Sequence, residues 1–406
     1  MSDSHTHAAP PRLLSLDAWR GFVMLLMMAE IMDLASLTSV QPAAEWAQHL
    51  AFHTSHVEWI GCSLHDMIQP SFSFLVGAAM VFSFTRRAEE GSRMLLLLHA
   101  LKRGLILVLM GVFLRSLDYD HTHWTLEDTL TQIGLGYPVL FALGFAGPRV
   151  LWSALGVILV GYWAFFALHA VPDNFNYAAV EAGPGTVLDG FAGHWSKGSN
   201  AAAAFDVWLF NRPGFLQWPL EFHHNSGGYC TLSFIPTLGT MLMGLLAGRV
   251  LISPRTHGHK LTWLAIAAAA GIALGLLLDA TGACPLVKRI WTPSWTLYSG
   301  GLCCCFLAFF YTVADVWGLR RSLFVLKVIG MNSLAAYFMA HLWTSFINEA
   351  LIRHFGALAD SWTSSMAFRQ KELHPAYLNV IKGAAILAAE WLILLWMYRR
   401  KFFIKV

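Results

Sequence analysis

The sequence predicts an all-α, polytopic integral membrane protein that forms a single domain over residues 1–406. Hydrophobic residues make up 56% of the chain and charged residues only 13%, about half of the roughly 25% usual in soluble domains. Apolar runs of roughly 20 residues, the length needed to cross about 30 Å of hydrocarbon, also recur along the whole chain. The net charge of +3 is too small to indicate a nucleic-acid-binding protein.

We predict about ten membrane helices from these runs. In chain order they cover residues 13–37, 66–86, 93–117, 128–147, 149–170, 229–251, 261–281, 295–317, 327–348 and 377–398. The third run carries Lys102 and Arg103 inside it. The first contains Asp17 and Arg20, which the apolar core of a cleavable signal peptide would not, so we expect no such peptide.

Basic residues set the expected orientation, because loops rich in Lys and Arg stay on the cytoplasmic side. Most of them fall on one side of the predicted spans, among them Arg12, Arg86, Arg87, Arg149, Arg249, Arg320 and Lys327. We therefore expect both termini in the cytoplasm and the segments 38–65 and 171–228 on the outer face. Lys288, Arg289 and Arg353 are the main basic residues expected on that outer side.

The cysteines do not indicate a metal site. Residues 303–305 read CCC inside an apolar run and lack the spacing of zinc ligands. Cys62, Cys230 and Cys284 are expected near the outer face, where a disulfide can form, but the sequence selects no pair. The segment 171–228 is too short for an independent enzyme domain and long enough to form a lid.

Ionisable residues within membrane helices are costly and are therefore candidates for function. Asp17 and Arg20 are three residues apart on one helical face, which also suits a simple ion pair at the interface. Glu30, later in the same run, has no partner nearby in the sequence and must face protein or water. The ninth run supplies polar side chains at Asn332, Ser333, Tyr337 and His341, of which the first two also suit hydrogen bonds between helices.

The stretch SHVEWIGCSLHDMIQPSFSFLVG, residues 55–77, places two histidines and two acids just before the second run. If the loop folds back at Gly61, Asp66 can hold the ring of His56 and make it a general base. Alternatively, Ser63 or Asp66 caps the following helix. A metal site built from His53, His56 and His65 matches no known zinc spacing, so no metal is expected.

A family resemblance favours the first of these readings. The motif RLLSLDAWRGF at 12–22 is followed by His56, Trp59, Gly61, Asp66 and Pro70 and by FLVGAAM at 74–80. Later motifs keep the same order: LTQIGLGY at 130–137, FIPTLGTMLMGLLAG at 234–248, RIWTPSWTLYSGG at 289–301 and GMNSLAAY at 330–337. Nearly all of the chain thus resembles the transmembrane acyltransferases related to heparan-alpha-glucosaminide N-acetyltransferase, as a bacterial member.

The resemblance implies an enzyme of the bacterial inner membrane that moves an acetyl group from cytoplasmic acetyl-CoA to an amino sugar on the outer side, and it implies a homodimer. His56 would be the base or a transient acetyl carrier, and Asp66 would orient it. The candidates for binding acetyl-CoA are Arg20 and Arg103, with Arg86, Arg87, Lys102, Asn332 and Ser333 as further ones. The candidates for binding the acceptor are Trp59, Glu30, Tyr337 and His341.

Three positions depart from the family pattern. Glu30 and Ile31 stand about where an asparagine is usual, GGYC at 227–230 replaces Pro-Glu-Gly, and Thr131 with Gln132 replaces a glutamine-arginine pair. The sequence therefore leaves the acceptor open. A transporter of amino sugars or N-acetylglucosamine is the alternative function, although no internal repeat typical of transporters is visible. A non-catalytic sensor that binds CoA or sugar is a third reading.

Overall fold

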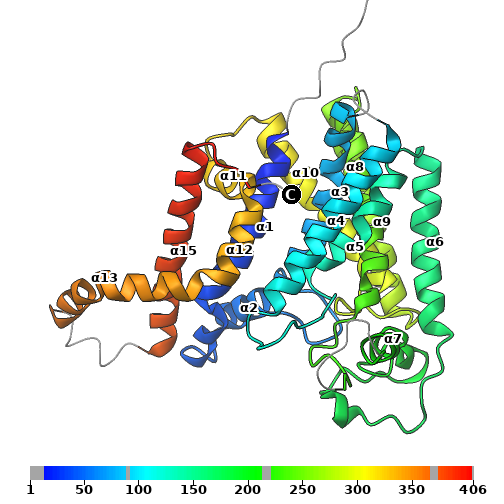
Figure 1. The fold of residues 1–406 in the computed structure, drawn as a ribbon, viewed down its shortest axis with the longest axis horizontal. Coiled ribbons are helices and arrows are strands. Elements are labelled where there is room, and N and C mark those ends of the chain that lie inside the picture. Colours follow the sequence, from blue (N-terminus) through cyan, green and yellow to red (C-terminus); the bar gives the residue numbers. More distant parts are fainter. Residues whose placement is uncertain (1–12, 88–91, 213–220, 366–373, 405–406) are drawn as a thin grey trace, which may run out of the picture.

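The computed structural model describes residues 13–87, 92–212, 221–365 and 374–404. Within these ranges the regular structure is helical, apart from an isolated antiparallel bridge between Ile60 and Val287. The predicted all-α class is therefore confirmed. Figure 1 shows most of the long helices running side by side, with α6 at one edge and α15 toward the other.

The described α-helices have the following bounds. They are α1 (Leu14–Met28), α2 (Glu45–Thr54), α3 (Ile68–Arg87), α4 (Arg93–Arg115), α5 (Thr129–Leu143), α6 (Pro148–Ala167), α7 (Ala201–Phe210), α8 (Phe234–Ile252), α9 (His257–Ala280), α10 (Pro293–Tyr311), α11 (Phe324–Met331), α12 (Ser333–Leu342), α13 (Thr344–Ser365) and α15 (Pro375–Arg399). Short 3-10 turns at Ala29–Met32, Leu34–Ser39, His65–Met67 and Thr231–Ser233 extend or precede some of them.

The structure does not confirm the count of ten membrane helices. Among the described residues, six helices are long and apolar enough to cross a membrane, and a bent pair raises the number to seven. The six candidate spans are formed by α4, α6, α8, α9, α10 and α15, two of them with an adjoining short helical turn. Helices α1 and α5 have 15 residues each, which at 1.5 Å per residue is about 22 Å and short of the hydrocarbon thickness.

The first predicted run, 13–37, is not one helix. Helix α1 ends at Met28 and passes into a 3-10 turn that holds Glu30. Asp33 then adopts the left-handed conformation, with φ of 46°, and a second 3-10 turn follows. Glu30 consequently lies beyond the end of α1 rather than within a membrane helix.

The ninth predicted run, 327–348, is also interrupted. Helices α11 and α12 meet at Asn332 with a bend of 80°. The side chain of Asn332 donates to the carbonyl of Phe402, 2.9 Å away, and accepts from the amide of Ile404 at 3.1 Å. Asn332 thereby ties the segment after α15 to the break between the two helices.

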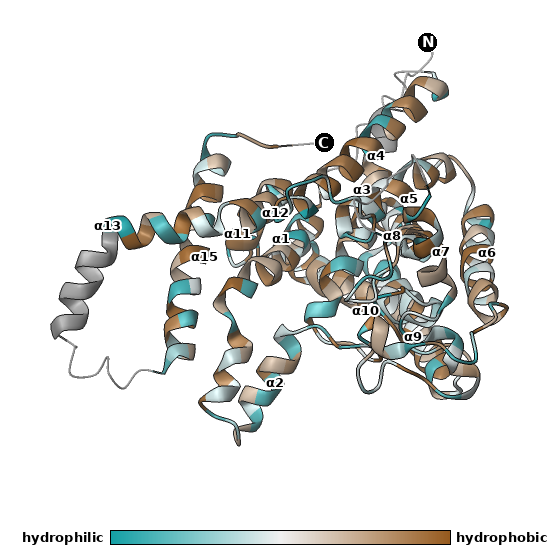
Figure 2. Ribbon diagram, turned by 60° about the horizontal axis from the view of Figure 1, so that its bottom comes forward, coloured by the Kyte–Doolittle hydropathy of each residue, from teal (hydrophilic) through white to brown (hydrophobic). Residues whose placement is uncertain are grey.

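Apolar side chains on the outer helices face away from the protein. Helix α6 exposes Val150, Trp152, Val157 and Val160, and similar exposed apolar side chains occur on α4, α9 and α15. Figure 2 shows mainly hydrophobic colouring along α4 and α6. Large exposed apolar surfaces of this kind suit contact with lipid. Helix α8, by contrast, is mostly buried within the bundle.

Glycines let two helix pairs pack with their backbones in contact. A Cβ on Gly77 of α3 would overlap the carbonyl oxygen of Met241 on α8, and one on Gly244 would overlap that of Phe74. In the same way, Gly21 of α1 and Gly330 of α11 lie against each other's helices. The second contact holds α1, which carries Arg20, beside the break that carries Ser333.

We expect Gly244→Leu to destabilise the protein by about 3 kcal/mol, the upper end of the usual cost of overpacking a core, because α3 would have to move away from α8. Thermal unfolding in detergent measures the effect. Gly156→Leu on α6 is the matched control, since no atom lies within 4 Å of a Cβ built there. Equal unfolding temperatures for the two variants would contradict this account of the α3–α8 contact.

Candidate functional site

His56, Asp66 and Lys288 form a cluster where three segments meet. His56 lies in the loop after α2, Asp66 lies in the 3-10 turn before α3, and Lys288 lies in the connection between α9 and α10. His56 Nδ1 is 2.8 Å from Asp66 Oδ1. Lys288 Nζ is 3.0 Å from the same His56 nitrogen and donates to Asp66 Oδ1 at 3.1 Å.

Backbone contacts bring these segments together. Ile60 and Val287 pair as an antiparallel bridge, and the amide of Gly61 donates to the carbonyl of Leu286 at 3.0 Å. Gly61 has φ of 122°, a conformation that favours glycine and lets the loop turn back toward Asp66. The bridge is why Lys288 lies next to His56 although 232 residues separate them.

Asp66 performs both of the roles that the sequence suggested. Its Oδ2 accepts from the backbone amide and the hydroxyl of Ser63, each at 3.0 Å, while the Asp66 amide donates to Ser63 Oγ at 3.2 Å. This reciprocal pair is a capping box at the start of the 3-10 turn. The other oxygen, Oδ1, remains for His56 and Lys288. The cap therefore fixes the carboxylate that holds the imidazole.

The cluster keeps Asp66 ionised and favours a neutral His56. Burial alone would raise the pKa of Asp66, but the hydrogen bond with His56 and the charge of Lys288 hold it well below its usual range. For His56, burial lowers the pKa and the hydrogen bond with Asp66 raises it, while the charge of Lys288 lowers it further. The net effect lowers the pKa of His56 from its ordinary value, which favours the neutral imidazole.

The hydrogen bonds also assign the tautomer of His56. An ionised Asp66 can only accept, which favours the imidazole proton on Nδ1; Lys288, 3.0 Å from the same nitrogen, then donates to Asp66 Oδ1 and not to the ring. Among the described residues, no side chain or backbone group hydrogen-bonds to Nε2, and the side chain is 40% exposed. The unprotonated Nε2 is therefore open to a substrate, in the arrangement of a carboxylate-oriented general base.

A second histidine lies against the first. The rings of His56 and His65 have centroids 4.6 Å apart. His65 is buried, and its Nε2 contacts Glu30 Oε1 at 2.7 Å. Glu30 thus has a partner that its sequence neighbours did not reveal, and it lies close enough to Tyr337 and His341 for electrostatic interaction.

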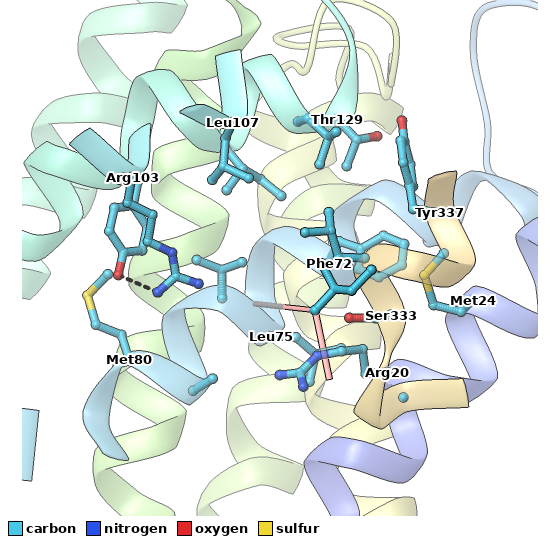
Figure 3. A pocket seen from close by; sticks show the side chains of 18 of the residues that line it. Arg20, Met24, Phe72, Leu75, Met80, Arg103, Leu107, Thr129, Ser333 and Tyr337 are labelled. Atoms are coloured by element: carbon cyan, nitrogen blue, oxygen red, sulfur yellow. Dashed lines mark hydrogen bonds between the residues drawn. The ribbon is translucent and has the colours of Figure 1, made fainter. Parts of the chain in front are cut away.

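A cavity of about 560 Å³ lies between α1, α3, α4, α5 and the α11–α12 break; we call it the central cavity. Four of the predicted site residues line it, namely Arg20, Arg103, Ser333 and Tyr337. Figure 3 shows Arg20 and Arg103 pointing into it from different sides, with Ser333 beside Arg20 and with Tyr337 and Thr129 at another end.

The two arginines also have protein partners. Arg20 lies 3.6 Å from Asp17, which is the ion pair that the sequence suggested as an alternative role. Arg103 donates to the hydroxyl of Tyr137 at 3.0 Å, and its guanidinium lies over the Tyr137 ring. Apolar side chains such as Phe72 and Leu75 form much of the remaining wall.

Two helices connect the central cavity to the histidine cluster along the chain. Met24 lines it one turn before α1 ends at Met28, and the next turn holds Glu30, the partner of His65. On α3, Phe72 lines the cavity six residues after Asp66, which is about 9 Å along a helix axis. The ends of two helices thus link the arginine-lined space to His56.

Other predicted site residues lie elsewhere. Asn332 is buried and binds the segment after α15, and Lys102 is exposed and does not line the cavity. The Nδ1 of His341 contacts the Tyr337 carbonyl of its own helix at 2.8 Å, and its ring stacks on Tyr337. The side chains of Arg86 and Arg87 lie outside the described part of the structure.

Trp59 anchors the loop that carries His56. It is 2% exposed, and its indole donates to the carbonyl of Trp195 at 3.0 Å. It packs in a buried cluster with Trp195, Phe166 and Tyr162. The segment 171–228, where described, thereby holds the His56 loop in place. Cys62, Cys230 and Cys284 are all free thiols in this structure.

Sequence reasoning missed Lys288 as a member of the site. The signal available was its position, because it is a basic residue on the side of the membrane where few are expected. It is also 7% exposed, and a buried lysine needs a charged partner. Among the described residues, no group of three or more His, Cys, Asp or Glu side chains is arranged to hold a metal ion.

Comparison with known proteins gives two similar sequences. Heparan-alpha-glucosaminide N-acetyltransferase of Homo sapiens is 24% identical over 369 residues, which cover 81% of this chain and 53% of that protein. Its counterpart in Mus musculus is 22% identical over 366 residues, covering 80% and 53%. The chain therefore spans about half the length of the relatives that it matches. No protein-family profile matches it. The homology supports a relation to this family of transmembrane acetyltransferases.

Proposed function

We propose that this protein is a membrane acetyltransferase that moves an acetyl group from cytoplasmic acetyl-CoA to the amino group of a glucosamine-like sugar on the outer face. The relatives, whose name describes N-acetyl transfer to a glucosaminide, support the reaction type. The observation that carries the proposal is the His56–Asp66–Lys288 cluster, which lies in the same bundle as a cavity lined by two arginines.

The central cavity suits the acetyl donor. Guanidinium groups match phosphate oxygens with paired hydrogen bonds, so Arg20 and Arg103 would bind the phosphates, with the Ser333 hydroxyl as a further donor. The apolar wall formed by Phe72 and Leu75 would accommodate the uncharged arm of acetyl-CoA. Acetyl-CoA supplies a thioester, whose C–S bond breaks as the new amide bond forms.

His56 would act on the attacking amine. Its Nε2 takes the proton that the amine loses as the C–N bond forms, and the positive charge that develops on the imidazole is stabilised by Asp66. The departing thiolate takes up a proton, so charge balances over the cycle. Lys288 keeps the resting imidazole neutral and ready to accept the proton.

The pH dependence should report this role. We expect the transfer rate to fall as pH drops through the pKa of His56, below 6.5, because the protonated imidazole cannot accept a proton. In Lys288→Met, the loss of the nearby positive charge should raise that pKa and shift the acidic limb to higher pH. The acceptor amine titrates identically in both proteins, so the difference between the two rate profiles isolates His56. Superimposable acidic limbs would contradict the assignment of Lys288.

One observation favours the alternative function, transport of amino sugars or N-acetylglucosamine. Helices α11 and α12 form a broken pair bent by 80° beside the central cavity. Interrupted helices often form the substrate sites of secondary transporters. The two functions differ in their products, because a transporter would move the sugar unchanged.

Sealed right-side-out vesicles loaded with acetyl-CoA separate the two functions. With glucosamine added outside, we expect N-acetylglucosamine to form only when acetyl-CoA is present inside, since donor and acceptor would reach the site from opposite faces. Vesicles that hold His56→Ala should form none and serve as the control. Uptake of unmodified glucosamine without acetylation would replace the transferase proposal by the transporter.

A further inference from the structure

A second pocket lies near the histidine cluster and contains none of the predicted site residues. It has a volume of about 210 Å³, and its polar lining includes Glu127, Asp206, His224 and Asn225. Aromatic side chains complete the wall, namely Tyr119, Phe210, Phe222 and Tyr229. We call it the polar pocket.

Two polar atoms in this pocket have no hydrogen-bond partner among the described residues. Asp206 is 4% exposed, and its Oδ2 accepts from the amide of Thr231 at 2.9 Å. Its Oδ1 is buried and has no hydrogen-bond partner among the described residues. His224 Nδ1 is likewise buried without a partner in that part of the chain. A buried polar atom without a partner is costly, so these two indicate a ligand that supplies hydrogen bonds.

The carboxyl groups of the pocket can both donate and accept. Burial raises the pKa of Asp206 to about 7, although its hydrogen bonds with Thr231 oppose the shift. Burial likewise raises the pKa of Glu127 to about 7, against the lowering effect of Arg115. A carboxyl group that is protonated part of the time can donate a hydrogen bond as well as accept one. Such a group matches a sugar hydroxyl, which also donates and accepts.

The pocket adjoins both parts of the proposed active site. Thr125 and Glu127 line the polar pocket, while Thr129 and Leu130, just after them, line the central cavity. One short segment leading into α5 therefore lines both spaces.

Arg289 links the pocket to the His56 loop. Its guanidinium lies over the ring of Tyr229, 5.4 Å from the centroid, and donates to the carbonyl of Gly227 at 2.6 Å. It also reaches the carbonyl of Val57, next to His56, at 3.5 Å. Lys288, the neighbour of Arg289 in the chain, contacts His56 itself. Arg289 thus connects a residue that lines the polar pocket to the backbone beside the proposed base.

We propose that the polar pocket binds the hydroxyl-bearing ring of the acceptor sugar, with Asp206, Glu127 and His224 bonding its hydroxyls and Tyr229 or Phe222 packing on its apolar face. This inference rests on the proposed function for the identity of the ligand. The volume is below the 300–1,000 Å³ of sites for drug-sized ligands, so a single sugar ring suits it better than an extended chain. The amine of the sugar would point toward His56.

Binding of glucosamine to the purified protein in detergent, without acetyl-CoA, tests the inference. We expect Asp206→Asn and His224→Ala each to raise the dissociation constant at least tenfold, because His224→Ala removes a partner for a sugar hydroxyl and Asp206→Asn replaces a carboxyl oxygen that can accept by an amide nitrogen that can only donate. Asp173→Asn, at an exposed carboxyl outside the pocket, should bind glucosamine like wild type. Cyclohexylamine, which has an amine and a ring without hydroxyls, should bind all four proteins alike.

Normal acetyl-CoA affinity shows that a variant is folded. If Asp206→Asn does not fold, His224→Ala still tests whether the polar pocket binds the sugar. Unchanged glucosamine affinity in a folded pocket variant, or no binding of glucosamine to wild type at millimolar concentration, would overturn the inference. Since no transfer is measured, these results are independent of the transferase proposal. A wild-type protein that binds glucosamine through this pocket but never acetylates it would refute only the proposed function.

Discussion

His56→Ala should abolish acetyl transfer to glucosamine while leaving acetyl-CoA binding nearly unchanged. A positioned general base contributes about 10²–10⁴ to the rate, and it acts in the transition state rather than on the bound donor. Asp66→Asn should cost less, because the imidazole remains although its tautomer is no longer fixed. The measurement is the transfer rate at saturating acetyl-CoA, together with the donor dissociation constant.

The chain supplies a matched control for this experiment. His121 Nδ1 lies 2.7 Å from Asp120 Oδ1, so this pair resembles the His56–Asp66 pair in distance but is exposed. His121→Ala should transfer acetyl at the normal rate. A His56→Ala protein that retains the normal rate would refute the catalytic assignment, whereas loss of acetyl-CoA binding in that variant would indicate damage to the fold.

Arg20→Ala and Arg103→Ala should each weaken acetyl-CoA binding by about 1.5–3 kcal/mol, the range for hydrogen bonds to charged groups. That range is about 10- to 150-fold in the dissociation constant. Lysine at either position should restore only part of the affinity, because it lacks the paired donors of the guanidinium. Titration of acetyl-CoA into the purified protein measures the effect.

Lys102→Ala is the control for the two arginine variants. Lys102 is adjacent to Arg103 on α4 but does not line the central cavity, so its loss should leave acetyl-CoA affinity unchanged. If both arginine variants fold and bind acetyl-CoA normally, Arg20 would be assigned to its ion pair with Asp17 and Arg103 to its contact with Tyr137.

The sequence was a good guide to the local part of the candidate site. His56 and Asp66 are ten residues apart with Gly61 between them, so one turn of the loop suffices to pair them. The cap by Ser63 was also readable from its spacing to Asp66. Sequence reasoning also selected Arg20 and Arg103, and the structure places both in one cavity, but their affinity for acetyl-CoA stays a prediction.

Sequence reasoning was less reliable for the membrane spans. Residues 327–348 are mostly apolar, so hydropathy alone predicted one helix where the structure has a bend of 80°. The break depends on Asn332, whose amide bonds the chain 70 and 72 residues further on. Hydropathy counts apolar residues and contains no information about such distant partners.

Composition and periodicity by themselves determined the helical, membrane-embedded character of this protein, and one short motif suggested the His56–Asp66 pair beside other readings. Tertiary structure alone decided that Lys288 completes the cluster and that Asp206, Glu127 and His224 share a pocket. The reason is that apolar periodicity records how each helix is exposed to lipid or protein, while Lys288 meets Asp66 across 222 residues through a single backbone bridge. Only the packed bundle fixes which polar residues of distant loops face one another.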